Sequence, residues 1–357
     1  MNKELLYKKI ESVAECMKTL SSRGDVIETC PVSNVDIDKW EWPQGIGMYG
    51  LFKYYELRGE ESTLNWLLSW YDAHIEKGLP DKNINTTAPL LALTYLYKYS
   101  PKQEYLDIFS EWAEYIMNEF DRTEENGFQH SGSGVNKLYG QLWDDTLIMT
   151  CMFLARAGEL LGKHEYIAEC ERQFLLHAKY LCDRNTGLWY HGWTFSGRHN
   201  FGKGLWGRGN CWITTAIADL LEFESVSEAT KLFLKETLLS QVKALANLQT
   251  EEGMWRTLLN DETSYVESSA TAGIGYGILK AVRTGWLPEE YRVVGEKAVE
   301  AILVRITSDG AVEDVSYGTD VGMTADDYKN IPVCIMPYGQ ALTILLLTEA
   351  GFLATEK

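Results

Sequence analysis

Apolar and polar residues follow two alternating helical patterns along the chain. In the first, apolar positions recur at helical spacing among Lys and Glu residues, which predicts amphipathic helices. These stretches lie near residues 3–18, 62–77, 102–119, 164–182, 227–248 and 288–306. The second pattern is rich in small and apolar residues, and it covers residues 45–55, 89–99, 145–161, 210–223, 269–282 and 338–350. The alternation predicts six helix pairs, each with an amphipathic outer helix and an apolar inner helix.

The loops repeat as well. Four of them place a turn glycine before an apolar or aromatic residue: NGFQH at 126–130, TGLWYH at 186–191, EGMWR at 252–256 and DGAV at 309–312. Glycine favours tight turns, so short β-hairpins are expected at one rim. The pattern predicts an all-α fold, an (α/α)6 barrel or six-hairpin toroid, rather than an open solenoid, because six pairs without polar capping repeats suit closure. No Pro-, Gly- or Ser-rich linker interrupts the chain, so residues 1–357 are expected to form one domain.

Composition narrows the classes of partner. A formal net charge of −18 argues against nucleic acid and anionic membrane surfaces, and an anionic substrate would need local Arg, Lys or His groups. We find no uninterrupted apolar run long enough to span a bilayer and no secretory signal. Seven cysteines without CxxC spacing indicate reduced thiols in a cytoplasmic protein. The sequence indicates no oligomeric state.

The familiar cofactor patterns do not occur in a suitable context. HExxH, CxxC and EF-hand spacings are absent, and so are the P-loop and dinucleotide-binding patterns. We therefore expect neither a metal nor another cofactor.

The carboxylates of Trp143-Asp144-Asp145 are the first candidates for chemistry, because they open an inner helix beside an indole. Carboxylates at a helix start commonly cap free N–H groups, and that structural role is the alternative for either one. Consecutive helical residues point roughly 100° apart, so one carboxylate can form a cap while the other faces the barrel mouth. A general acid needs a raised pKa, which a dry aromatic pocket or a neighbouring carboxylate would have to supply.

Aromatic and histidine residues mark two further candidate positions. Trp40 and Trp42, in the segment WEWPQG, could stand at a pocket rim as stacking surfaces for sugars, or form a buried aromatic plug. His130 and His191 close two equivalent loops, which favours a shared functional role over an incidental one.

A candidate cation, Arg208, lies at the start of the fourth predicted inner helix. Arg208 stands between Gly207 and Gly209, close to Trp206. A guanidinium can bind a carboxylate through two hydrogen bonds, and flanking glycines would keep it accessible. The alternative is an arginine paired with a core acid.

Six segments in combination carry a family resemblance: WEWPQG at 40–45, NGFQH at 126–130, QLWDDT at 141–146, GLWYHGW at 187–193, WGRGNCW at 206–212 and YVESSATAG at 265–273. In order, and over nearly the full length, they resemble the unsaturated rhamnogalacturonyl hydrolases of glycoside hydrolase family 105. The more distant unsaturated glucuronyl hydrolases of family 88 share the architecture and the chemistry.

The resemblance implies an (α/α)6 barrel that removes a terminal 4,5-unsaturated uronic acid from lyase-generated oligosaccharides of pectin-type rhamnogalacturonan. A carboxylic acid protonates C4, water adds at C5, and the hemiketal collapses to release the next sugar. Asp145 matches the position of the acid and base. The residues that the resemblance places around the substrate are Trp42, Asn85, His130, Trp143, Asp144, His191, Trp206 and Arg208, with Arg208 suited to the uronate carboxylate.

Asn85 marks a departure from the family pattern, because it matches the position of a second carboxylate and an amide holds no negative charge. Three other functions stay open: hydrolysis of unsaturated glucuronyl oligosaccharides, an (α/α)6 sugar epimerase using His130 and His191, and a non-catalytic scaffold. An epimerase would leave the Trp-Asp-Asp motif unexplained.

Overall fold

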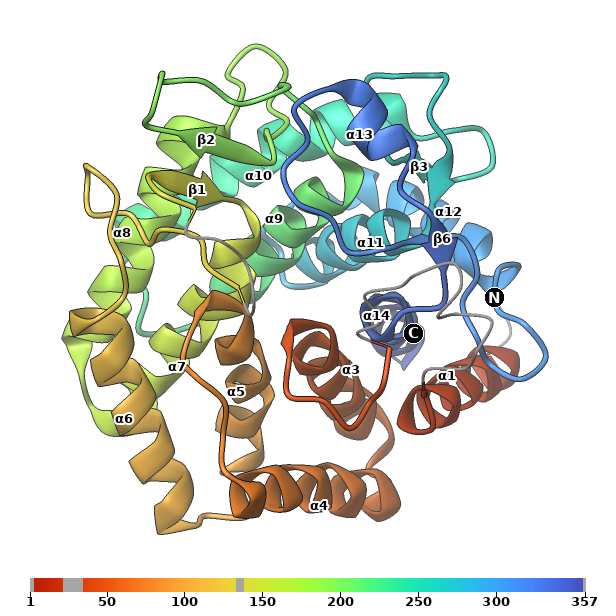
Figure 1. Ribbon diagram of the computed structural model, residues 1–357. Helices are drawn as coiled ribbons and strands as arrows, with labels where there is room; N and C mark the ends of the chain where they lie inside the picture. The colour runs from red at the N-terminus through yellow and green to blue at the C-terminus, as the bar shows by residue number, and fades with distance from the viewer. Residues whose placement is uncertain (1–2, 22–34, 133–137, 356–357) are drawn as a thin grey trace.

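The computed structural model describes residues 3–21, 35–132 and 138–355, in which helices form an outer and an inner ring (Figure 1). The outer helices are α1 (Lys3–Lys18), α4 (Glu61–Lys77), α6 (Gln103–Asn118), α8 (His164–Leu181), α10 (Glu228–Leu248) and α12 (Arg292–Leu303). The inner helices are α3 (Trp42–Arg58), α5 (Ile84–Leu96), α7 (Met152–Leu161), α9 (Gly207–Leu220), α11 (Ser268–Arg283) and α14 (Pro337–Thr355). The six predicted helix pairs are confirmed. Of the seven cysteines, Cys30 lies outside the described residues.

The inner ring is closed. Helix α3 contacts α5 and α14, α5 contacts α7, and α11 contacts α9 and α14. Helix α9 closes the ring against the π-helical turn Leu147–Cys151 that opens α7, so the open solenoid is excluded. Small residues make this packing possible: a Cβ on Gly277 of α11 would lie 2.6 Å from the Thr214 carbonyl oxygen of α9. Inner helices are apolar all round because both of their faces are buried, whereas the outer helices keep one face in water. The closed (α/α)6 barrel is therefore as predicted.

Short strand pairs form the rim above the inner helices. β3 (Trp255–Arg256) pairs with β4 (Val266–Glu267), and β5 (Val315–Ser316) pairs with β6 (Val333–Cys334), each within one loop. The third pair differs from the expected hairpin, because β1 (Gln141–Trp143) and β2 (Gly192–Thr194) come from successive loops. The turn residues have left-handed φ angles at Gly187, Gly253 and Gly310, but in the first loop this role falls to Asn126 rather than Gly127.

Two short helices and one unusual turn complete the chain. The helices are η2 (Glu289–Tyr291) and α13 (Ala325–Lys329). A π-helical turn, η1 (Leu147–Cys151), opens α7 directly after Asp145. Single π-turns recur at functional sites, where the extra residue re-aims neighbouring side chains.

A buried ion pair lies at the opposite end of the inner helices. Lys280, near the end of α11, places its Nζ 2.5 Å from Asp219 Oδ1 on α9. The hydroxyls of Tyr49 and Tyr276 also donate to the Asp219 carboxylate, at 2.9 and 2.6 Å. Burial alone would lower the pKa of Lys280, but the charge of Asp219 and its neighbours raises it well above its ordinary value. This network joins three inner helices far from the rim loops.

Candidate active site

A cavity of about 330 Å³ opens where the inner helices begin. Glu41 to Pro43 stand at the start of α3, Asn85 lies in the first turn of α5, Asp145 precedes η1, and Met336 precedes α14. The full lining is Glu41, Trp42, Pro43, Asn85, His130, Gly132, Leu138, Trp143, Asp145, Tyr317, Gly318, Thr319, Asp320 and Met336. The positive ends of several helix dipoles therefore point towards one small cavity.

Asp145 and His191 form the central polar contact. His191 Nε2 lies 3.2 Å from Asp145 Oδ2, and His191 Nδ1 lies 3.0 Å from the Tyr328 hydroxyl. The Tyr328 hydroxyl accepts the Gly322 N–H, so its own proton can go to Nδ1, which leaves the imidazole proton on Nε2 facing Asp145. Burial acts to raise the pKa of Asp145, but the contact with His191 outweighs it and lowers the pKa below its usual range.

Asp144 points away from the cavity. Its side chain is fully buried, and among the described residues neither carboxylate oxygen has a hydrogen-bond partner. A Cβ on Gly209 would lie only 2.2 Å from Asp144 Oδ2, so the first turn of α9 has room for this carboxylate only because residue 209 is glycine. Burial, and then the charge of Asp145, raise the pKa of Asp144 well above its ordinary value. The two adjacent carboxylates thus face different surroundings, as the helical geometry predicts.

His130 packs flat against Trp143, with ring centroids 4.1 Å apart and planes 10° from parallel. Its Nδ1 lies 3.1 Å from Thr146 Oγ1. Burial lowers the pKa of His130 to about 4, so this ring is neutral at pH 7. His130 can therefore donate or accept one hydrogen bond in the cavity without adding a charge.

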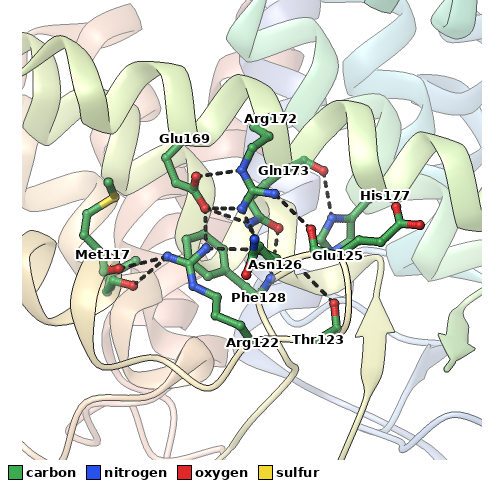
Figure 2. A network of polar contacts seen from close by, with 12 residues as sticks. Met117, Arg122, Thr123, Glu125, Asn126, Phe128, Glu169, Arg172, Gln173 and His177 are labelled. Carbon is green, nitrogen blue, oxygen red and sulfur yellow. Dashed lines mark hydrogen bonds and ion pairs between the residues drawn. The ribbon is translucent and has the colours of Figure 1, made fainter. Parts of the chain in front are cut away.

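Side chains of α8 contact the loop at Asn126 and Phe128 (Figure 2), just before His130. Gln173 accepts the Phe128 N–H at 3.0 Å and donates to the Asn126 carbonyl at 3.1 Å. Glu169 in turn accepts hydrogen bonds from three side chains, those of Arg122, Arg172 and Gln173. The outer helix thus fixes the backbone that presents His130 to the cavity.

The position of Arg208 differs from the expected one, in which its side chain would contact the uronate carboxylate. Its side chain is buried and is not part of the cavity lining. It donates to the carbonyls of Ser316 and Tyr317 at 2.8 and 2.7 Å, and it lies 3.9 Å from Glu267, the N-cap of α11. The flanking glycines admit the Asp144 carboxylate and the backbone of Arg256 rather than a substrate. Arg208 holds the strand that leads into the cavity wall at 317–320.

The tryptophans divide into two groups. Trp42 and Trp143 line the cavity, and Trp42 is backed by Tyr338 with ring centroids 4.8 Å apart. Trp206 lies behind the cavity, against His191 at 4.2 Å. Trp40 is a buried plug, stacked on an indole of α4 and hydrogen-bonded to the Thr86 carbonyl, which is the second of the two alternatives for this residue.

Five of the predicted site residues line the cavity: Trp42, Asn85, His130, Trp143 and Asp145. Four lie immediately behind it: Asp144, His191, Trp206 and Arg208. The cavity wall formed by Tyr317 to Asp320 was not predicted from the sequence. The repeat offered a signal for it, because this segment follows the turn at 309–312 as the segments with His130 and His191 follow theirs.

One cluster in the described part of the chain has donor atoms close enough together to surround a cation. Asp144, Asp145 and His191 each offer one such atom, and these atoms lie within 4.8 Å of one another. Of these three residues, Asp145 is the one that also lines the cavity. The expectation of no metal stays a prediction.

The closed barrel and its aromatic, carboxylate-bearing cavity together define a carbohydrate-active enzyme of the six-hairpin glycosidase class. The chain belongs to Glycosyl Hydrolase Family 88, whose family model matches residues 10–353. It is 33% identical to the unsaturated rhamnogalacturonyl hydrolase YesR of Bacillus subtilis over 312 residues, which is 87% of this chain and 89% of that protein.

Solved structures agree with this assignment. A possible member of the GH105 family from Salmonella enterica superimposes with a TM-score of 0.94 at 38% identity, covering 99% of this chain and 95% of the other. An unsaturated glucuronyl hydrolase from Bacillus sp. GL1 superimposes with a TM-score of 0.70, covering 96% of each chain. At 16% identity, that second likeness shows the fold alone.

Proposed function

We propose that this glycoside hydrolase releases a terminal 4,5-unsaturated uronic acid by hydrating its C4=C5 double bond. The observation that carries the proposal is the placement of Asp145, which lines the cavity with Trp42 and Trp143 and contacts His191 at 3.2 Å. The cavity volume falls within the roughly 300–1,000 Å³ of small-molecule sites. Two indoles supply apolar faces for a sugar ring, and the carboxyl group supplies the acid–base chemistry.

In the proposed reaction, Asp145 delivers a proton to C4 and the ring oxygen stabilises the positive charge that develops at C5. Water then adds at C5 and returns a proton to the Asp145 carboxylate. The resulting hemiketal opens to a ketone at C5, and the exposed hemiacetal at C1 loses the neighbouring sugar. The anomeric carbon is not attacked, so the spacing of two carboxylates that governs direct-displacement glycosidases does not apply.

Among the described residues around the cavity, no Lys or Arg offers a charged partner to the uronate carboxylate. Asn85 and Thr319 offer neutral hydrogen-bond donors there. The amino ends of α3 and α5 add a favourable field for an anion. Arg208 acts indirectly, because its hydrogen bond to the Tyr317 carbonyl holds the backbone of the cavity wall.

The substrate we propose is unsaturated galacturonic acid at the end of lyase-generated rhamnogalacturonan oligosaccharides, which places the protein in pectin degradation. The likeness to the Bacillus subtilis rhamnogalacturonyl hydrolase supports this choice over glucuronyl oligosaccharides. The epimerase alternative is disfavoured, because His191 is 1% exposed and is not among the lining residues, so it cannot face a sugar opposite His130.

We further propose that the protein works in the cytoplasm as one domain, on a small oligosaccharide rather than on nucleic acid or a membrane. Cys151, Cys170 and Cys211 are buried thiols, in keeping with a reducing compartment. Among the helices in the described ranges, none combines the length and apolarity needed to cross a membrane.

The experiment that tests the function compares unsaturated and saturated uronyl disaccharides. With the unsaturated substrate, the ultraviolet absorbance of the double bond should disappear as the free sugar accumulates, for both α- and β-linked compounds. The matched saturated disaccharides should be left intact. Cleavage of saturated compounds at a similar rate would replace hydration with a conventional glycosidase mechanism.

A further inference from the structure

We propose that Asp144 holds the proton that Asp145 delivers to the substrate, so that the two carboxyl groups act as a pair sharing one proton. The inference rests on the proposed function and adds a residue to it. Asp144 does not touch the cavity, so it acts through Asp145 as a positioning residue and proton store.

The first ground is the isolation of the Asp144 carboxyl. It is fully buried, and neither oxygen has a hydrogen-bond partner in the ranges that the structure describes. An ionised carboxylate in that position would lose its hydration, and the nearby backbone and Arg208 charge offset only part of the cost. Proteins avoid such a cost, several kcal/mol, by neutralising the group. A protonated Asp144 gains a donor instead, and the neighbouring Asp145 carboxylate is an acceptor for it.

The second ground is the set of charged and titratable groups around the pair. They are His130, His191, Arg208, Cys211 and Tyr328. Arg208 is the cation among them, and it is occupied by the carbonyls of Ser316 and Tyr317. Two adjacent carboxylates without a dedicated cation share a proton at neutral pH, because both cannot ionise together at low cost.

The third ground is the division of roles between the two groups. Burial and the charge of Asp145 raise the pKa of Asp144, whereas the contact with His191 keeps Asp145 ionised against the effect of its own burial. An ionised Asp145 can accept a proton from water but has none to give to C4. The Asn85 amide in the cavity wall cannot supply one either.

Over one catalytic cycle, the two carboxyl groups return to the protonation state in which they began. The proton moves from Asp144 to Asp145 as Asp145 protonates C4, which leaves both carboxylates ionised beside the positive charge at C5. Water adds at C5 and gives its proton to Asp145, and that proton returns to Asp144. The net change is one water molecule added across the double bond.

The test compares wild type with Asp144→Asn, which keeps the shape and a donor N–H but carries no transferable proton. The activity of the wild type should fall at alkaline pH as the pair loses its proton. In the variant, Asp145 must take its proton from solvent at its own lower pKa, so the alkaline limb should move down by at least one pH unit. At pH 7, kcat should drop about tenfold or more and recover towards acid pH, with little change in KM.

A second measurement does not depend on activity. The infrared spectrum of resting, chelator-treated wild type at pH 7 should contain a protonated-carboxyl C=O band that is missing from Asp144→Asn. Thermal unfolding of the variant checks that it is folded. An unchanged pH profile, or wild type without the band, would overturn the proposal. A wild type that has the band but leaves unsaturated disaccharides intact would contradict the proposed function and not the proton pair.

Discussion

At the scale of single residues, Asp145 carries the proposed chemistry. Asp145→Asn should lower kcat by roughly 10²–10⁴-fold, because the amide can neither deliver a proton to C4 nor accept one from water. The fold should be kept, since the side chains have the same shape. Steady-state kinetics and circular dichroism check both points, with Asp107→Asn on the exposed face of α6 as the control. Near-normal turnover in Asp145→Asn would remove this residue from the acid–base role.

Arg208 is a second residue whose surroundings set its expected behaviour. Arg208→Ala breaks three hydrogen bonds, two to Ser316 of β5 and one to Tyr317 after it, and leaves Glu267 buried without its nearest cation. We expect a loss of about 3–5 kcal/mol in the free energy of unfolding, with a parallel loss of kcat/KM as the wall at 317–320 shifts. Urea unfolding measures the first effect. A raised KM with unchanged stability would instead restore direct contact with the substrate carboxylate.

At the scale of elements, the positions of the helices could be predicted from the periodicity of apolar residues. Whether a given side chain lines the cavity or lies behind it could not be predicted in this way. The inner helices are buried on all faces and the outer helices on one, so the inner helices are apolar all round and the outer helices are amphipathic. Arg208 and Asp145 both open inner helices, yet one lies behind the cavity and the other lines it. This difference depends on β5, which meets the Arg208 side chain only after the ring closes.

The ion pair between Asp219 of α9 and Lys280 of α11 lies at the end of the inner helices opposite the cavity. It allows a test of whether the two ends of the barrel contribute separately to stability and to substrate binding. Lys280→Met should lower the free energy of unfolding by about 3–5 kcal/mol, because it leaves the Asp219 carboxylate buried beside two tyrosines. KM should stay unchanged, since Lys280 lies at the opposite end of the inner helices from the cavity. Lys297→Met, at an exposed site on α12, serves as the control. A large KM change would show that the two ends of the barrel are linked.

At the scale of the whole molecule, buried histidines set how the fold responds to acid. Burial lowers the pKa values of His130 and His177 from 6.5 to about 4 in the folded state. The unfolded chain therefore binds more protons below pH 6.5, and stability should be lost as the pH falls from 6.5 towards 4. His177→Leu should reduce that loss by about 3 kcal/mol. Denaturant unfolding across this pH range measures the effect, and His164→Leu, at an exposed site, is the control. If His177→Leu loses stability with falling pH as much as the wild type and the control do, the account is contradicted.

The central claim is that the closed barrel positions Asp145 to protonate a double bond rather than to assist displacement at the anomeric carbon. The most direct measurement is nuclear magnetic resonance of the product formed from an unsaturated uronyl disaccharide in deuterated water. The account predicts a 5-keto product that carries deuterium at C4, from both α- and β-linked substrates. A product without deuterium at C4 would contradict it.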